Sequence, residues 1–315
     1  MQRIAASLAS LDPARMNDHL VALAATGSRD PRHPGHAKAV AYIKEQLKAL
    51  EYRGWSIESQ RTVYQGIPLE NIFATIDPAP GATAPNGSAQ RPPPPVGASG
   101  WVMLAAHYDT TAVRSPTWRP AVDPAPGADD NGTGTAALLE MQAGLSDLRA
   151  EGWLTERVVL AFFDGEELFF KGSAAYVATL PRPAPYAAVV NIDMVGFNPL
   201  ADRLDLIWYT DASAALRDRV VATNDRYGVG VAPLVAQFAG DGNTILDAAP
   251  FGLAGIPSVA LVERYGPADA TYPGNSRFHT PSDTPDGVTN PRLWLKAARL
   301  TLGTALEMVV RDPRP

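Results

Sequence analysis

The sequence predicts a single α/β domain in which a mostly parallel sheet is covered by helices on both faces. From residue 101 onward, short apolar stretches of strand length alternate with stretches that have helical spacing. The strand stretches are nearly continuous apolar runs, as expected for strands that are buried on both faces of a sheet. A length of 315 residues would allow two domains. Because no repeat or linker separates a second core, we expect one domain over residues 1–315.

Residues 1–50 are predicted to form helices at the start of this domain. Asp12 followed by Pro13 is typical of a helix N-cap with proline at the first helical position, and Gly27 marks the expected end of that helix. A second helix is expected after His36. Its apolar residues recur at helical spacing, namely at Val40, Ile43, Leu47 and Leu50.

The rest of the chain predicts strands first and then alternating strands and helices. Residues 55–76 predict two strands around a turn at 65–68. Residues 77–100 are crowded with Pro, Gly and Ala, so we expect a surface loop within the domain, because proline-rich backbone cannot complete a strand ladder. The later strands are expected at 101–106, 157–163, 188–192, 204–209 and 257–262, and the later helices at 133–148, 174–180, 213–227 and 291–310.

The composition argues against several classes of function. The net charge of −6 and the absence of a basic run do not favour binding to nucleic acid or to an anionic membrane. No apolar run approaches the ~20 residues of a membrane span, and the first residues do not resemble a secretory signal. The chain has no cysteine. Any bound metal must therefore be held by His, Asp and Glu.

Polar residues follow three of the predicted strands at the point where each strand ends. His107 and Asp109 follow the strand at 101–106, Glu166 and Glu167 follow the strand at 157–163, and Asp193 ends the third. In α/β sheets, ligands bind beyond the carboxyl ends of the strands. The spacing of two places His107 and Asp109 on the same side of an extended backbone. Asp109 is therefore suited to accept the proton of the far imidazole nitrogen and to orient the histidine.

A further segment and the glutamate pair carry residues that can bind metals. Asp129 and Asp130 lie in a glycine-flanked turn before a helix, and a carboxylate held in such a turn can bridge two cations with its two oxygens. The adjacent Glu166 and Glu167 must point in different directions, so one can bind metal while the other acts as a general base. Each feature alone has an ordinary structural explanation, such as a helix cap or a salt bridge. The set predicts a hydrolytic site with two metal ions.

These segments resemble one family. The motifs H-Y-D, G-A-D-D-N-G, D-G-E-E, N-I-D-M and F-H-T-P-S-D-T occur in this order at residues 107–109, 127–132, 164–167, 191–194 and 278–284. In this order they resemble the co-catalytic zinc aminopeptidases, whose superfamily also contains the glutaminyl-peptide cyclotransferases. The resemblance extends over roughly residues 25–310 and implies a mixed sheet of about eight strands between helices.

The resemblance also implies the metal ligands, one residue at a time. Asp130, rather than Asp129, would bridge two Zn²⁺ ions. His107 and Asp193 would complete the coordination of one ion, and Glu167 and His279 that of the other. His/carboxylate sets of this kind suit zinc.

The remaining implied roles concern catalysis and support. Glu166 would be the general base, and Asp109 and Asp247 would support the site. The family often has a cis peptide bond after the bridging aspartate, which here would be Asp130–Asn131. The implied activity is hydrolysis of the N-terminal residue from a peptide with a free N-terminus. We expect a monomer. Because most family members are exported, we also expect an extracytoplasmic location.

The sequence departs from the family pattern at three places. Phe169 and Phe170 follow the two glutamates where the family usually has glycine two positions on, so we expect them to reshape one wall of the site. Phe278 precedes the last histidine where some members have tyrosine, whose hydroxyl helps to stabilise the oxyanion. Ala248 follows Asp247 where the family commonly has histidine.

Three other functions remain open at this point. Glutaminyl-peptide cyclotransferases use a single zinc at positions that match Asp130, Glu167 and His279, but they typically have tryptophan at the position of Phe278. A carboxypeptidase or dipeptidase would need arginines that bind a terminal carboxylate. The candidates for that role are Arg264 and Arg277. Related non-catalytic binding ectodomains have lost ligands, whereas this chain keeps all of them.

Overall fold

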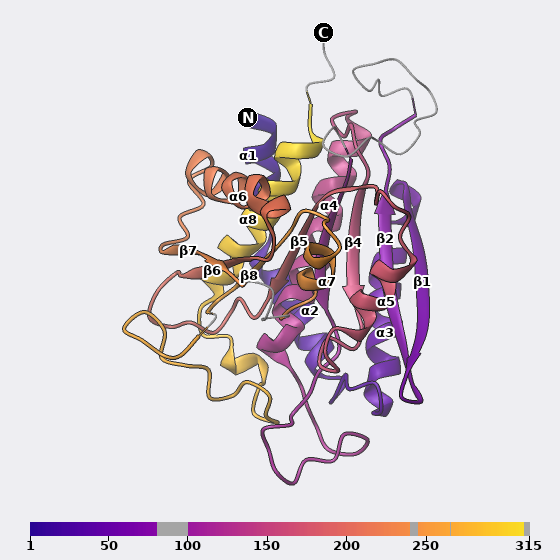
Figure 1. Cartoon of the computed structure of the whole chain (residues 1–315), viewed down its shortest axis with the longest axis vertical. Helices are drawn as coiled ribbons and strands as arrows, with labels where there is room; N and C mark the ends of the chain where they lie inside the picture. The colour runs from indigo at the N-terminus through magenta and orange to yellow at the C-terminus, as the bar shows by residue number, and fades with distance from the viewer. Residues whose placement is uncertain (81–99, 240–244, 265, 312–315) are drawn as a thin grey trace.

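The fold is an α/β sandwich around one twisted sheet (Figure 1). The computed structural model describes residues 1–80, 100–239, 245–264 and 266–311, so most of the predicted loop at 77–100 lies outside the described residues. The sheet consists of β1 (Trp55–Tyr64), β2 (Ile67–Ile76), β3 (Trp101–His107), β4 (Val158–Phe163), β5 (Tyr186–Asp193), β6 (Leu204–Trp208), β7 (Leu234–Phe238) and β8 (Ser258–Val262). The predicted α/β class with a mixed sheet of about eight strands is confirmed.

The strand order is β1-β2-β4-β3-β5-β8-β6-β7. The centre of the sheet is parallel, because β3 pairs in parallel with both β4 and β5, and β5 pairs in parallel with β8. The β1–β2 hairpin adds to β4 in antiparallel orientation, and β6 is antiparallel to β8. The carboxyl ends of β3, β4 and β5 therefore meet at one edge of the sheet.

The helices form layers on both faces of the sheet (Figure 1). They are α1 (Gln2–Ala9), α2 (Pro13–Ala24), α3 (Pro34–Lys48), α4 (Thr133–Ala150), α5 (Lys171–Thr179), α6 (Ala214–Arg226), α7 (Ala248–Leu253) and α8 (Pro291–Val309). Helices α3, α4, α6 and α8 cover one face, and α5 and α7 cover the other. No helix in the described ranges is both long and apolar enough to cross a membrane.

Alternate residues of the central strands serve two cores. Val102 and Leu104 of β3 pack in the core beneath α4 and α8, whereas Met103 and Ala105 pack in the core that contains Phe251 of α7. All four β3 residues are fully buried. The uninterrupted apolar runs of these strands are thus explained, because both faces of the sheet are removed from water.

Three elements were not predicted individually, and a fourth begins earlier than expected. Helix α1 lies within the predicted helical residues 1–50 but was not distinguished as a separate helix, although its buried residues lie on one face. Helix α7, with six residues, and the half-exposed edge strand β7 were not predicted, because neither carries a strong hydrophobic periodicity. Helix α5 begins at Lys171 rather than at residue 174. Gly172 lies inside this helix because a Cβ atom there would lie 1.9 Å from the carbonyl oxygen of Asp164. The predicted helix therefore began too late, because Gly172, which close packing requires, was assigned to the preceding loop.

The turn before α5 has an unusual backbone. Phe169 and Phe170 have φ values of 66° and 58°, in the left-handed region that favours glycine. The Phe169 side chain is 75% exposed, so little burial offsets this conformation. A left-handed conformation costs an L-residue about 1–2 kcal/mol. The segment directly after Glu166 and Glu167 is therefore locally strained.

Replacing Phe169 by glycine should stabilise the fold. The free energy gained by relieving the left-handed strain is larger than the free energy lost to the greater flexibility of glycine in the unfolded chain. We therefore expect the free energy of unfolding to rise by about 0.5–1 kcal/mol. Denaturant unfolding measures this change. Val63→Gly is the matched control, because Val63 is also exposed but lies in regular strand β1, where glycine should destabilise. A loss of stability in both variants would contradict the prediction.

Candidate metal centre

Parallel strand ends bring three of the predicted segments together. His107 is the last residue of β3, Asp193 is the last residue of β5, and Glu166 and Glu167 follow β4 by three and four residues. His107 and Asp193 are buried, with 0% and 3% of their surfaces exposed. The register places His107 beside Phe163 at the end of β4. Residues that are far apart in the sequence therefore share one edge of the sheet.

The fourth segment is the turn Ala128–Gly132, which leads into α4. Its peptide bond Asp130–Asn131 is cis, as the resemblance implied. The Asn131 side chain donates to the carbonyl of Ile192 in β5 over 2.9 Å, which ties the turn to the strand that carries Asp193. Gly134 allows this close approach, because a Cβ atom there would lie 2.4 Å from Asn131 Oδ1.

The fifth segment is the loop that contains His279, and Asp283 fastens it to the turn. The two carboxylate oxygens of Asp283 accept hydrogen bonds from the backbone N–H groups of Asp129 and Asp130, each over 3.0 Å. The Ala128 N–H donates to the Asp283 carbonyl over 3.0 Å as well. Asp283 thus sets the position of the Asp130 backbone relative to His279.

The five predicted ligands converge in two clusters that share Asp130. His107 Nε2 lies 3.2 Å from Asp130 Oδ1 and 3.3 Å from Asp193 Oδ2. His279 Nε2 lies 3.0 Å from Asp130 Oδ2 and 2.9 Å from Glu167 Oε2. Within each cluster the ligand atoms lie within 4.8 Å of one another. Asp130 therefore presents one carboxylate oxygen to each cluster, as a bridging ligand must.

The donor atoms fit zinc. His107 Nε2, Glu167 Oε1 and Asp193 Oδ1 are buried without a hydrogen-bond partner within the described part of the chain. Buried polar atoms without partners are costly, and coordination of a cation would satisfy them. Two histidines with three carboxylates are the nitrogen and oxygen ligands that Zn²⁺ accepts. The residues present therefore suit a pair of zinc ions.

The electrostatics of the clusters favour cations. Burial lowers the pKa of His279, but hydrogen bonds to Asp130 and Glu167 outweigh it and raise that pKa to about 10. Burial and the neighbouring Asp130 carboxylate raise the pKa of Glu167 to about 8, against the opposing effect of His279. Without metal, the site therefore holds protons in place of metal cations.

Asp109 lies behind both His107 and the two glutamates. Its Oδ1 atom is 3.4 Å from His107 Nδ1, and its carbonyl oxygen is 3.2 Å from the same nitrogen. The carboxylate also accepts hydrogen bonds from the backbone N–H groups of Glu166 and Glu167, over 3.1 and 3.2 Å. Asp109 thus links the histidine of one cluster to the backbone of the glutamate pair.

Glu166 and Asp247 are close to the clusters but belong to neither. Burial raises the pKa of Glu166 well above its usual range, with further raising by Asp193 and Glu167. Asp247 precedes α7, and its carboxylate oxygens accept no hydrogen bond from the described residues. Burial, Asp109 and Asp193 raise the pKa of Asp247 to about 7 despite the charge of His107. Asp247 also raises the pKa of Glu166, so both carboxyl groups face the same site.

Several supporting residues were not predicted. Asn275 donates to Asp129 Oδ2 over 3.0 Å and accepts from the N–H groups of Arg277 and Phe278, so it braces the loop before His279. Asp283 falls within the F-H-T-P-S-D-T motif, and that position was the available signal. Asn275 lies outside the motifs, so only the three-dimensional contacts reveal it.

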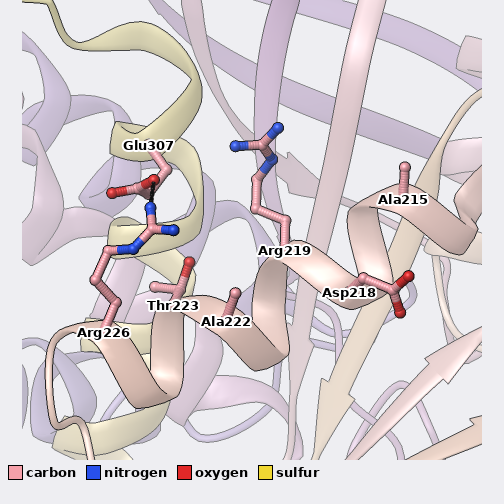
Figure 2. A pocket seen from close by; sticks show the side chains of 7 residues that line it. All are labelled: Ala215, Asp218, Arg219, Ala222, Thr223, Arg226 and Glu307. Atoms are coloured by element: carbon pink, nitrogen blue, oxygen red, sulfur yellow. Dashed lines mark hydrogen bonds and ion pairs between the residues drawn. The ribbon is translucent and has the colours of Figure 1, made fainter.

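A hollow of about 240 Å³ lies elsewhere in the fold, between α6 and α8. Figure 2 shows the side chains that line it. It is lined by Arg219, by Thr223 and by the ion pair of Arg226 with Glu307, among others. None of its lining residues is a predicted site residue. The metal-binding chemistry therefore belongs to the sheet edge and not to this hollow.

Comparisons with known proteins define the class of this site. The model of the family described as peptidase family M28 matches residues 89–304. The chain belongs to this family. Aminopeptidase YwaD of Bacillus subtilis (strain 168) is 26% identical over 226 residues, which cover 68% of this chain and 42% of that protein. The chain spans only about half the length of the curated relatives that it matches.

Solved structures share the fold. The LapA aminopeptidase of Legionella pneumophila is similar with a TM-score of 0.73 and 18% identity, covering 98% of this chain and 75% of that one. Glutaminyl cyclase of Porphyromonas gingivalis is similar with a TM-score of 0.68 and 18% identity, covering 94% of this chain and 98% of that one. The family match and the donor set together support Zn²⁺ as the cofactor.

Zinc binding should release protons. With a pKa of about 10 in the metal-free protein, His279 is protonated at pH 7, and zinc must displace that proton. We therefore expect the zinc affinity to fall as the pH is lowered. Calorimetric titration at pH 7 in buffers with different ionisation enthalpies measures the number of protons released, and His279→Asn should release fewer. A zinc-binding enthalpy that does not depend on the buffer would refute this expectation.

Proposed function

We propose that the protein is a zinc-dependent aminopeptidase that hydrolyses the N-terminal residue of peptides. The observation that carries this proposal is the shared Asp130 carboxylate, which joins two complete His/carboxylate clusters beside an uncommitted glutamate, Glu166. The family match and the aminopeptidase relatives support the class of reaction. The cleaved substrate would be a peptide with a free N-terminus.

When bound, zinc would supply positive charge that polarises the scissile carbonyl and makes a water more acidic. The chain itself supplies the proton transfer. Glu166 is the proposed general base, which takes the proton of the attacking water at a carboxylate oxygen and passes it to the leaving amine. Asp109 holds the Glu166 backbone through the 3.1 Å hydrogen bond, so the base stays fixed relative to His107.

The environment of Glu166 suits a base that works near neutral pH. Burial and the neighbouring carboxylates raise its pKa well above its usual range in the metal-free protein. Bound cations act in the opposite direction and restore the ionised form. A carboxylate poised between these effects can accept a proton and release it again.

A hollow lies next to the loop that carries His279. It has a volume of about 470 Å³ and is lined by residues of the segment 115–124 together with Pro281, two residues after His279. This volume falls within the range of ligand pockets in proteins. Its lining includes Trp118 and the paired side chains of Arg119 and Asp123. We propose that this hollow receives part of the substrate.

The main alternative is a glutaminyl-peptide cyclotransferase with a single zinc. The likeness to the Porphyromonas gingivalis enzyme and the cluster of Asp130, Glu167 and His279 favour it. The cluster of His107, Asp130 and Asp193 does not separate the two by itself, because the resemblance implies that cyclotransferases keep an acidic residue at the position of Asp193 to move protons. The residue before the last histidine favours the peptidase. Phe278, which stacks on His279 with 3.6 Å between ring centroids, stands where cyclases typically have tryptophan.

A carboxypeptidase or dipeptidase receives less support. Arg264 lies 3.0 Å from Asp269, and Arg277 lies 2.8 Å from Asp286. Both of the candidate arginines already have a carboxylate partner within the chain. Neither therefore offers an uncompensated guanidinium for the terminal carboxylate of a substrate.

One assay separates the two enzymatic proposals. The protein is loaded with one or two equivalents of Zn²⁺ and incubated with peptides that begin with leucine or glutamine, and the products are identified by mass spectrometry. A freed first residue, with full activity only at two equivalents, supports the aminopeptidase. Loss of ammonia from the intact glutamine peptide at one equivalent supports the cyclotransferase. No change in either peptide would refute both.

Glu166→Gln should abolish turnover without loss of zinc. Glu166 is in neither ligand cluster, so zinc affinity should stay close to that of the wild type. Loss of the proton acceptor should lower kcat by about 10²–10⁴-fold. Glu58→Gln, an exposed strand residue, is the control and should leave kcat unchanged. Wild-type turnover in Glu166→Gln would remove Glu166 from its proposed role.

A further inference from the structure

A buried arginine lies behind the metal centre. Arg29 lies two residues after Gly27, beyond the end of α2, and none of the surface of Arg29 is exposed. In the described part of the chain, its side-chain hydrogen bonds go to main-chain carbonyls and none goes to a carboxylate. Arginine is almost never fully buried unless it is paired. The surroundings of Arg29 must therefore compensate its charge in another way.

The guanidinium is held by three main-chain carbonyls. Arg29 Nε donates to the Tyr108 carbonyl over 2.6 Å, Nη1 to that of Pro126 over 2.6 Å, and Nη2 to that of Gly127 over 2.8 Å. Hydrogen bonds to a charged group are stronger than those between neutral groups. Three such bonds in a planar fork fix the acceptors relative to one another.

These carbonyls belong to the two segments that carry metal ligands. Tyr108 lies between His107 and Asp109, and Gly127 begins the turn that presents Asp130. The Gly127 carbonyl also accepts the N–H of Gly132, which closes that turn. One rigid side chain thus joins the end of β3 to the turn before α4.

The main chain of Arg29 adds a second link between the same segments. Its N–H donates to Thr110 Oγ1 over 2.8 Å, and that hydroxyl donates to the Ala125 carbonyl over 2.9 Å. The sequence positions linked in this way lie just beyond His107 on one side and just before Asp130 on the other. The contacts of Arg29 therefore fix the distance between the segment that carries His107 and the turn that carries Asp130.

We propose that Arg29 is a positioning residue of the metal centre, which sets the distance between His107 and Asp130 and places a positive charge behind the ligand carboxylates. The role does not depend on which peptide or reaction the enzyme acts upon. It concerns the affinity of the ligand set for zinc.

The charge of Arg29 is consistent with this role. Burial lowers its pKa to about 10, while Asp283, Asp130 and Asp109 oppose the lowering. Arg29 therefore remains charged at neutral pH and counters the mutual repulsion of the buried carboxylates. A lysine would keep a positive charge, but it cannot donate to three carbonyls in the fixed geometry of a fork.

Arg29→Lys tests the proposal through zinc affinity, measured by competition with a chelator in the absence of substrate. Partners behind metal ligands typically contribute about 10–100-fold to metal affinity, so we expect a loss of at least about ten-fold. Arg203→Lys is the matched control, because Arg203 is also buried but donates to Asp205 and Thr271, which are not ligands. The control should keep wild-type affinity.

A milder variant covers the case in which Arg29→Lys fails to fold. Thr110→Val removes the hydroxyl that links Arg29 to Ala125, and we expect a loss of zinc affinity of a few-fold, whereas Thr110→Ser should retain it. Thermal unfolding of the same samples separates affinity from stability. Wild-type zinc affinity in folded Arg29→Lys or in Thr110→Val, even with a lowered Tm, would overturn the proposal.

Discussion

The structure depends on a concentration of buried negative charge at one edge of the sheet. Asp130, Glu167 and Asp193 lie within contact distance of only two imidazoles, and Glu166 and Asp247 add to their field. Burial, together with repulsion between neighbouring carboxylates, raises the pKa values of Glu167 and Asp247 to about 8 and about 7, so the ionised forms are disfavoured without a cation. A pair of divalent cations relieves this repulsion and satisfies the unpartnered ligand atoms together.

The fold holds these ligands through hydrogen bonds between charged side chains and the main chain of the ligand segments. Asp283 binds two N–H groups of the turn that contains Asp130, and Asp109 binds the N–H groups of both glutamates. Arg29 supplies the complementary contacts by donating to carbonyls. Acidic side chains fix N–H groups and a basic one fixes carbonyls, so the segments that carry His107, Asp130 and Glu167 are held by charge-assisted hydrogen bonds.

The departures from the family pattern affect the surroundings of the site and not its ligands. Phe169 occupies a left-handed backbone position beside the glutamate pair, and Phe278 stacks on His279. Both aromatic residues lie within two positions of a ligand in the sequence. We expect them to shape the surroundings of an unchanged ligand set, where substrate preference would differ among related chains.

The sequence by itself determined the α/β class, the strands that end in His107 and Asp193, and the identity of the five ligand candidates. The strands could be predicted because they are continuous apolar runs, and His107, Glu167 and Asp193 follow strand ends. The choice of Asp130 and His279 came from the resemblance of short motifs to the zinc aminopeptidases. Only the tertiary structure decided how Arg29, Asn275 and Asp283 support those ligands. Their contacts join segments that lie tens of residues apart or more and leave no periodic signal in the sequence. The elements α1, α7 and β7 were not identified from the sequence for a related reason. Each is short, so packing against its neighbours stabilises it more than its own local pattern does.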